Sequence, residues 1–376
     1  SDCELPDRSY NYVDCILLNG KNNMKNKKIY LEFMRIIACF FVIVNHTMSY
    51  VFWDYLPGGK TWCVSVFIFF LSKFSVPVFL MISGIVLLGK EDSCKKSFNR
   101  VKKSGIIVIG VSLVYYIYDC KKTSLEFNIV VFVKRVIEGP MSNCLWYMYM
   151  YIGILLILPV LQKMTKSMKK QDYMYMLVSG FFLLSVCPVI AHWLDESGIS
   201  NLITDSMLSV YVLMVVLGYY LEKYVDLKNG CIKWLLLIIG SETCINVGLT
   251  YIEWNDLKKA GKLTSPNDYL FYSNKEYINV MILSVCVFFA LKYLYLKYEC
   301  MLNEKVKHAI TYLGSLTLGT YVMGDLWIDI FLPLYYKSSV IIHPIVSMII
   351  MEIVVFVTGM IFTAVLKKIP IIKSVL

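Results

Sequence analysis

Residues 29–46 read IYLEFMRIIACFFVIVNH, and this stretch decides the fold. Apart from a few polar side chains it is continuously apolar. A helix needs about 20 apolar residues to cross a bilayer core, because it rises about 1.5 Å per residue. We therefore expect a membrane-spanning helix at roughly 29–51.

The composition of the whole chain agrees with this first segment. Of the 376 residues, 58% are hydrophobic and 17% are charged, whereas soluble domains have about 45–50% apolar and about 25% charged residues. The apolar residues form long unbroken blocks, while an outer-membrane barrel would show alternating segments of about 10 residues. These features exclude a cytosolic enzyme, a DNA-binding domain and an outer-membrane barrel.

Similar blocks recur along the chain and predict an all-α fold, a polytopic transmembrane helical bundle of about ten spans. The expected spans are 29–51, 62–88, 104–119, 145–162, 174–192, 206–222, 232–252, 277–297, 311–333 and 343–366.

The net charge of +10 reports topology rather than a nucleic-acid partner. If the first span enters from the cytoplasm, 23 of the 37 Lys and Arg residues fall in cytoplasmic segments and 10 fall on the other face. Basic residues concentrate on the cytoplasmic side of membrane proteins. We expect both termini to be cytoplasmic, in a multi-pass protein of the inner or plasma membrane.

The first residues differ from the rest. Residues 1–23 are polar and lack the order of a signal peptide, and the run MKNKK at 24–28 is typical of the start of an inner-membrane protein. We expect 1–23 to be an extension, either a short cytoplasmic tail or a segment upstream of the true start. Residues 24–376 would then form one transmembrane domain.

Twelve cysteines suggest neither a metal site nor a disulfide framework, because the chain has no CxxC motif and the spacings are irregular. Inside spans a thiol acts as a small apolar filler. Cys120 and Cys144 share one external segment, 120–144, and whether they pair is left open. We expect no metal and no bound cofactor.

Ionisable side chains inside spans are costly and mark candidate functional sites. Arg35 and His46 are eleven residues apart, which at about 100° per residue is three turns plus about 20°, so both project from one face of the helix about 16 Å apart. Glu32, three residues before Arg35, can neutralise or orient it. Arg grips anionic phosphates and neutral His accepts a proton from a hydroxyl. Snorkelling of Arg35 and a helix-contact role for His46 are the structural alternatives.

Four segments in order resemble the integral-membrane acyltransferase-3 family. The first is LEFMRIIACFFVIVNH at 31–46, which is similar to the R-x10-H opening helix of that family. The others are KFSVPVFLMISG at 73–84, LWYMYMYIGILLILP at 145–159 and TLGTY at 317–321. Where the family often has Arg this chain has Lys73. Where the family has a Tyr in the third segment and a His after the last Tyr, this chain has Leu155 and Gly324.

The resemblance implies a membrane enzyme that moves an acyl group, with acetyl expected first, from cytoplasmic acyl-CoA to a hydroxyl of an envelope glycan or lipid-linked sugar. His46 would be the general base, with direct transfer and an acyl-His46 intermediate both open. Arg35 would hold the donor and Glu32 would orient Arg35. Further donor or substrate contacts would come from Lys73, Ser83, Trp146, Tyr147 and Tyr321.

Other polar residues within spans are Glu242, Asn246, Asp325, Asp329 and Glu352. Glu242 and Glu352 are mid-span carboxylates that could partner His46 or Lys73, or could form inter-helix hydrogen bonds. Two other functions compete with acyl transfer: a transporter or flippase of lipid-linked glycans, and a non-catalytic sensor or scaffold of the same fold.

Overall fold

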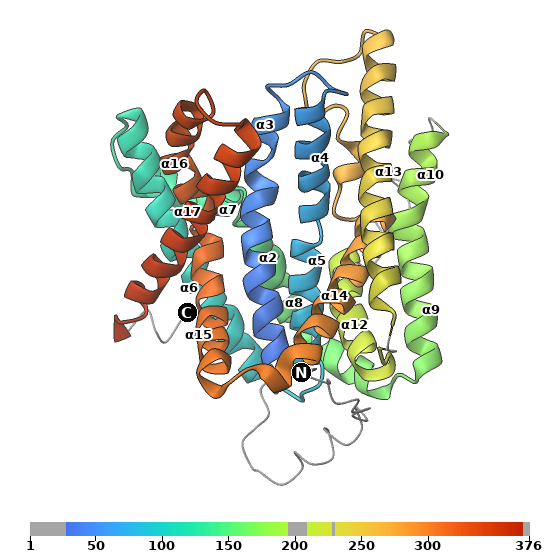
Figure 1. The fold of residues 1–376 in the computed structure, drawn as a ribbon. Helices are drawn as coiled ribbons and strands as arrows, with labels where there is room; N and C mark the ends of the chain where they lie inside the picture. The colour runs from blue at the N-terminus through green and yellow to red at the C-terminus, as the bar shows by residue number, and fades with distance from the viewer. Residues whose placement is uncertain (1–27, 195–208, 228–229, 371–376) are drawn as a thin grey trace, which may run out of the picture.

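The computed structural model describes residues 28–194, 209–227 and 230–370. Within these residues every regular element is a helix (Figure 1), which confirms the expectation of an all-α fold. The expected extension 1–23 and the start of the expected span 206–222 lie outside the described residues.

The helices follow one another from the first transmembrane segment to the last. They are α2 (Ile29–Thr47), α3 (Ser49–Phe52), α4 (Lys60–Ser72), α5 (Ser75–Leu87), α6 (Cys94–Thr123), α7 (Ile129–Glu138), α8 (Trp146–Ser167), α9 (Lys170–Phe181), α10 (Cys187–Trp193), α12 (Val210–Tyr224), α13 (Ile232–Lys259), α14 (Ile278–Tyr298), α15 (Glu304–Val322), α16 (Gly324–Ser338) and α17 (Pro344–Leu366).

Eight helical segments of the described chain are long and apolar enough to cross a membrane. The two other expected spans correspond to α12, which has 15 residues, and to the pair α15 and α16. The expected external connection 120–144 contains one further helix, α7. Its N-cap is Asn128, whose side chain accepts hydrogen bonds from the backbone amides of Val130 and Val131.

Helix α2 stands near the middle of the bundle in Figure 1 and contacts α5, α14, α15 and α17. Its neighbour in sequence, the expected span 62–88, is interrupted between α4 and α5. Pro77 explains the interruption, because it has no N–H to donate to the carbonyl of Lys73 and its ring clashes with that carbonyl. The break places Lys73 at a helix junction inside the bundle.

Helices α5 and α12 pack against each other through glycine. A Cβ on Gly84 would lie 1.8 Å from the carbonyl oxygen of Val215, and a Cβ on Gly218 would lie 2.2 Å from that of Met81. Small residues allow helix backbones to approach this closely in membranes. The Ser83-Gly84 pair therefore has a packing role through its glycine.

The expected span 311–333 is also interrupted, at Met323 between α15 and α16. Tyr115 of α6 bridges this break, because its hydroxyl donates to the Val322 carbonyl (3.2 Å) and accepts from the Leu326 amide (3.1 Å). The break starts a new helix inside the protein, and Asp325 lies in its first turn, where the helix dipole favours a negative charge.

Candidate active site

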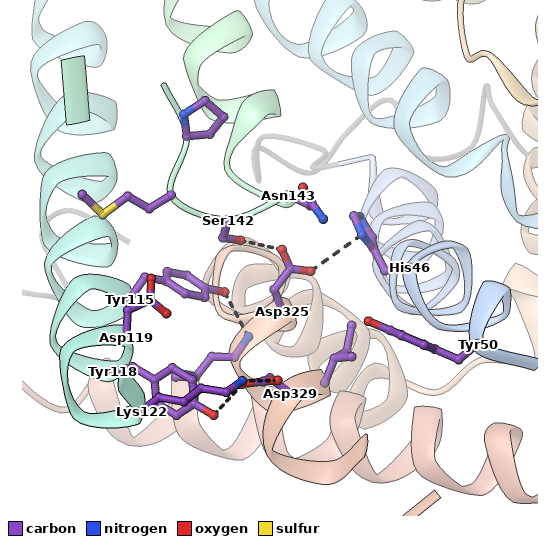
Figure 2. Close-up of a pocket in the computed structure, with 14 residues that line it drawn as sticks. His46, Tyr50, Tyr115, Tyr118, Asp119, Lys122, Ser142, Asn143, Asp325 and Asp329 are labelled. Atoms are coloured by element: carbon purple, nitrogen blue, oxygen red, sulfur yellow. Dashed lines mark hydrogen bonds and ion pairs between the residues drawn. The ribbon is translucent and has the colours of Figure 1, made fainter. Parts of the chain in front are cut away.

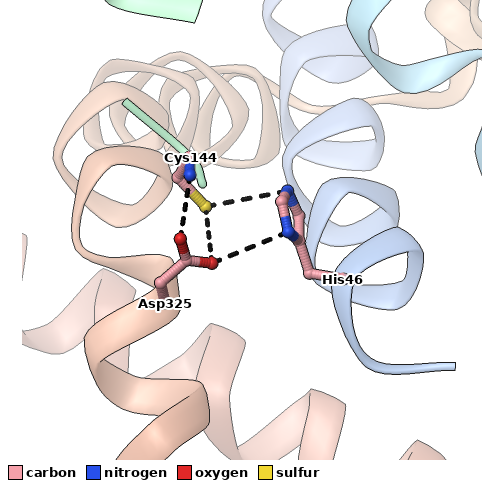
Figure 3. A group of neighbouring side chains, drawn as sticks. All are labelled: His46, Cys144 and Asp325. Carbon is pink, nitrogen blue, oxygen red and sulfur yellow. Dashed lines mark hydrogen bonds and ion pairs between the residues drawn. The ribbon is translucent and has the colours of Figure 1, made fainter. Parts of the chain in front are cut away.

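His46 lies in the last turn of α2 and faces two groups from distant parts of the chain (Figure 3). Its Nδ1 is 3.7 Å from Oδ1 of Asp325, and its Nε2 is 3.8 Å from Sγ of Cys144. The Cys144 thiol donates to Oδ1 of Asp325 at 3.0 Å. A base, a thiol and a carboxylate therefore meet at one point, from α2, the start of α8 and the start of α16.

Asp325 fixes the segment that precedes α8. Its Oδ2 accepts from the hydroxyl of Ser142 (2.5 Å) and from the backbone amide of Cys144 (2.8 Å). The first amides of a helix have no partner within the helix, and a nearby carboxylate satisfies such donors. The carboxylate thus holds the thiol in place through both the main chain and the side chain of Cys144.

A cavity of about 340 Å³ extends from His46 between α2, α6, α16 and the 139–144 segment (Figure 2). Its lining is mostly polar and aromatic, and it lies toward the end of the bundle where α2 ends. Lys122 pairs with Asp329 at 2.6 Å, and the Tyr118 hydroxyl donates to the same carboxylate at 2.6 Å. Its other polar lining residues include Tyr50, Asp119, Ser142 and Asn143. Such a lining suits a ligand that is rich in hydroxyl groups.

A wall of aromatic rings runs from the cluster toward the start of α2. Tyr147 packs at 5.6 Å from Tyr321 and 5.9 Å from Tyr151, measured between ring centres. The Tyr321 hydroxyl donates to the carbonyl of Cys144. Arg35 lies near Tyr147 and Tyr151, at the far end of this wall. The wall therefore connects the Arg35 region with the cluster at His46.

The structure places Ser83 beside the same wall. The Ser83 hydroxyl donates to the Phe79 carbonyl (2.9 Å), and the Phe79 ring packs on Tyr147 and Tyr321.

Glu32 accepts from Arg35 at 3.0 Å, as expected for residues three apart on a helix. Glu32 is buried against Gly314 of α15, where a Cβ would lie 2.5 Å from Oε2 of Glu32.

Two lysines approach His46 from another side. Lys73 lies at the break between α4 and α5, with Nζ 3.7 Å from the centre of the Phe69 ring. Lys275 lies over the ring of Trp146, with Nζ 3.9 Å from its centre. The charges of both lysines act on His46. In the described part of the chain, neither ammonium group forms an ion pair with a carboxylate.

The remaining intramembrane carboxylates do not contact His46 directly. Glu352 of α17 accepts from the hydroxyl of Thr47 at 2.6 Å, so it supports the residue next to His46. Glu242 is bonded to Asn246, which in turn accepts from Asn279 at 3.0 Å. These contacts are inter-helix and intra-helix hydrogen bonds, the structural alternative for such residues.

The sequence alone missed two members of the site. Cys144 was considered only as a possible disulfide partner of Cys120, and both thiols are free in the structure. Lys275 falls between the expected spans 232–252 and 277–297, where a basic residue indicates topology and not a site. The sequence did hold one signal, because Cys144 directly precedes the Leu145-Trp146 motif.

Together His46, Cys144 and Asp325 offer a nitrogen, a sulfur and an oxygen within 4.8 Å of one another, a set that could also hold a divalent metal.

The comparison with family models supports the resemblance found in the sequence. Residues 28–367 match the model Acyl_transf_3, described as an acyltransferase domain. No significant match was found among curated proteins or among solved structures. The match covers nearly the whole chain, including every residue of the cluster and of the aromatic wall. The chain therefore belongs to the acyltransferase family represented by this domain, and it is a multi-pass membrane protein of that family.

Proposed function

We propose that this acyltransferase moves an acyl group, acetyl first among the candidates, from acyl-CoA to a hydroxyl of an envelope glycan or lipid-linked sugar. The observation that carries the proposal is the position of His46. Its ring lies where the polar cavity meets the aromatic wall that leads to Arg35. A base at the junction of two differently lined regions can serve two different substrates.

The region on the Arg35 side suits the donor. By the distribution of basic residues, the start of α2 faces the cytoplasm, where acyl-CoA is available. Arg35, held by Glu32, offers a fork of donors to a phosphate or pyrophosphate. Lys73 adds positive charge near His46, where the thioester oxygen would develop negative charge.

The cavity suits the acceptor. Its tyrosines, carboxylates, Ser142 and Asn143 supply both donors and acceptors for sugar hydroxyls. Because the cavity lies at the opposite end of α2 from Arg35, an acceptor can reach His46 without crossing the bundle. Trp146 and Lys275, which pack against each other, would contact a substrate bound near His46.

In this mechanism His46 takes the proton of the acceptor hydroxyl, and the oxygen attacks the acyl carbonyl. Asp325 lies near the other nitrogen of the ring and stabilises the imidazolium that forms. The proton then passes to the departing thiolate. Groups placed where charge develops lower the barrier without reorganisation of water.

The proposal is tested by mass spectrometry of envelope glycans from cells that produce the chain and from cells that lack it. An acyl group present only in the first sample, and lost when Arg35 or His46 is replaced by alanine, is the expected result. Glycans that differ in location but not in mass would indicate a transporter or flippase. No difference in either property would indicate a sensor or scaffold. Both outcomes contradict acyl transfer.

A further inference from the structure

We propose that Cys144 is an acyl carrier in this enzyme: its thiol accepts the acyl group from the donor thioester and hands it to the acceptor hydroxyl. The inference rests on the proposed acyl transfer and adds a second nucleophile to it. A covalent thioester would divide the reaction into two half-reactions, so the donor and acceptor need not be bound together.

The placement of the thiol supports this role. Cys144 is 1% exposed, and Sγ lies within 4 Å of both a base and a carboxylate. Each of its polar groups has a partner that fixes it: the amide and thiol bond to Asp325, and the carbonyl accepts from Tyr321. A cysteine that only fills space needs none of these three hydrogen bonds. Fixed nucleophiles beside a base are typical of covalent catalysis.

The thiol also lies at the N-terminus of a long helix. Leu145 is the N-cap of α8, which runs for 22 residues, so Cys144 lies directly before the positive end of the helix dipole. His46 Nε2 lies 3.8 Å from Sγ and can take the thiol proton once the S–H group turns from Asp325 toward the ring. The flanking residues Ser142 and Asn143 line the cavity, which brings the acceptor region next to the sulfur.

The start of α16 lies beside the sulfur of Cys144. Gly324 packs here, and a Cβ added to it would lie 3.6 Å from Sγ of Cys144, in ordinary contact. Glycine therefore leaves no side chain of residue 324 in contact with the thiol, where an alanine would touch the sulfur.

The two half-reactions balance. In the first, the thiol proton passes to His46, Sγ forms a bond to the acyl carbon of the donor, and the carbon–sulfur bond of the donor breaks. The departing thiolate takes the proton from His46. In the second, His46 takes the proton of the acceptor hydroxyl, the oxygen bonds to the acyl carbon, and the bond to Sγ breaks. The Cys144 thiolate then recovers its proton from His46.

The test uses full-length protein purified from cells that acylate their glycans. Mass spectrometry of the native protein is expected to show a fraction with one acyl group, which neutral hydroxylamine removes because it cleaves thioesters. Cys144→Ala is expected to lose this adduct and to lower glycan acylation at least 100-fold. Cys144→Ser is expected to carry a hydroxylamine-resistant ester, because an oxygen ester replaces the thioester. Cys120→Ala, which changes another buried cysteine that packs with Tyr116 and Phe132, should match the wild type.

Three outcomes overturn the proposal. Glycan acylation by Cys144→Ala within about twofold of the wild type would assign direct transfer by His46, and the proposed function would stand. An adduct that persists in Cys144→Ala would place the carrier elsewhere, for example on His46. Stoichiometric zinc in the wild type that is lost in both Cys144 variants would make the thiol a metal ligand. If the wild type does not acylate glycans at all, the proposed function itself fails.

Discussion

Replacing Asp325 with Asn isolates the contribution of one charge, because the two side chains have nearly the same shape. The amide oxygen can keep the bonds from Ser142 and from the Cys144 amide, now without charge. The amide NH2 would face the Cys144 thiol and His46, so the bond at 3.0 Å and the contact at 3.7 Å lose their acceptor.

The expected effect on the rate follows from these contacts. Hydrogen bonds to charged groups contribute about 1.5–3 kcal/mol and neutral ones about 1 kcal/mol, so the loss is at least about 2 kcal/mol. The attraction between a carboxylate and an imidazolium at this separation is at most about 4 kcal/mol at an effective dielectric constant of about 20. At about 1.4 kcal/mol per factor of ten, Asp325→Asn should slow acyl transfer by about 30-fold to 1,000-fold.

The assay measures acyl transfer in isolated membranes, per amount of folded protein, together with the thermal unfolding midpoint in detergent. Asp268→Asn is the matched control, since Asp268 accepts bonds from Thr264 and Ser265 in a connecting segment outside the site. We expect the control to keep the wild-type rate. A rate for Asp325→Asn above a third of the wild type, with normal folding, would refute the role given to this charge.

Three further predictions concern folding and positioning. Burial alone would raise the pKa of Asp92, but hydrogen bonds from charged and amide partners outweigh it and hold the pKa below the ordinary value. The ionised carboxylate therefore stabilises the folded protein at neutral pH, and this contribution is lost only as the pH falls through the lowered pKa. Asp92→Asn should lower the unfolding free energy by about 1.5–3 kcal/mol, equally at pH 5 and pH 8, and a penalty that disappears by pH 5 would contradict this. Gly84→Ala should lower the unfolding midpoint strongly and reduce the yield of folded protein, because α12 must move away; an unchanged midpoint would contradict the close packing. Glu352→Gln should keep at least half the transfer activity, because its amide oxygen still accepts from Thr47, whereas Glu352→Leu should lose at least tenfold as the support beside His46 is removed; equal activities would refute the positioning role.

The Gly84 and Asp92 experiments each have a matched control in the chain. Gly105→Ala adds the same methyl group where nothing lies within 4 Å, so its midpoint should not fall. Glu304→Gln removes a carboxylate from the exposed pair with Lys307, and exposed ion pairs contribute about 0–1 kcal/mol. It should match the wild type at both pH values, in contrast to Asp92→Asn.

The fold class could be predicted because burial in a bilayer leaves a strong mark on sequence. Long apolar blocks identified the spans, and the eight apolar helices agree with them. The interruptions at Lys73 and at Met323 were not predicted. The first follows from Pro77, a signal that was present in the sequence. The second has no proline nearby and depends on Tyr115 of α6, a contact between residues more than 200 positions apart.

Helical periodicity could relate residues of the candidate site only along single helices, and the family resemblance supplied the residues expected from other helices. Arg35, Glu32 and His46 share α2, so periodicity was enough to relate them. Residues that tertiary packing brings to His46 leave no such periodic signal. Cys144 and Asp325 are 181 positions apart, and only the packing of α8 against the break before α16 joins them. A cysteine among twelve and an aspartate among several intramembrane carboxylates could not be singled out by spacing.

The central claim is that acyl transfer takes place at His46, and replacement of its imidazole tests this most directly. Membranes that contain wild-type protein, His46→Ala or His46→Gln are compared for acyl groups transferred to envelope glycan, at equal amounts of folded protein. We predict that both variants fall to the level of membranes without the protein, since neither alanine nor glutamine can accept the proton. Transfer by either variant at the wild-type rate would contradict the account.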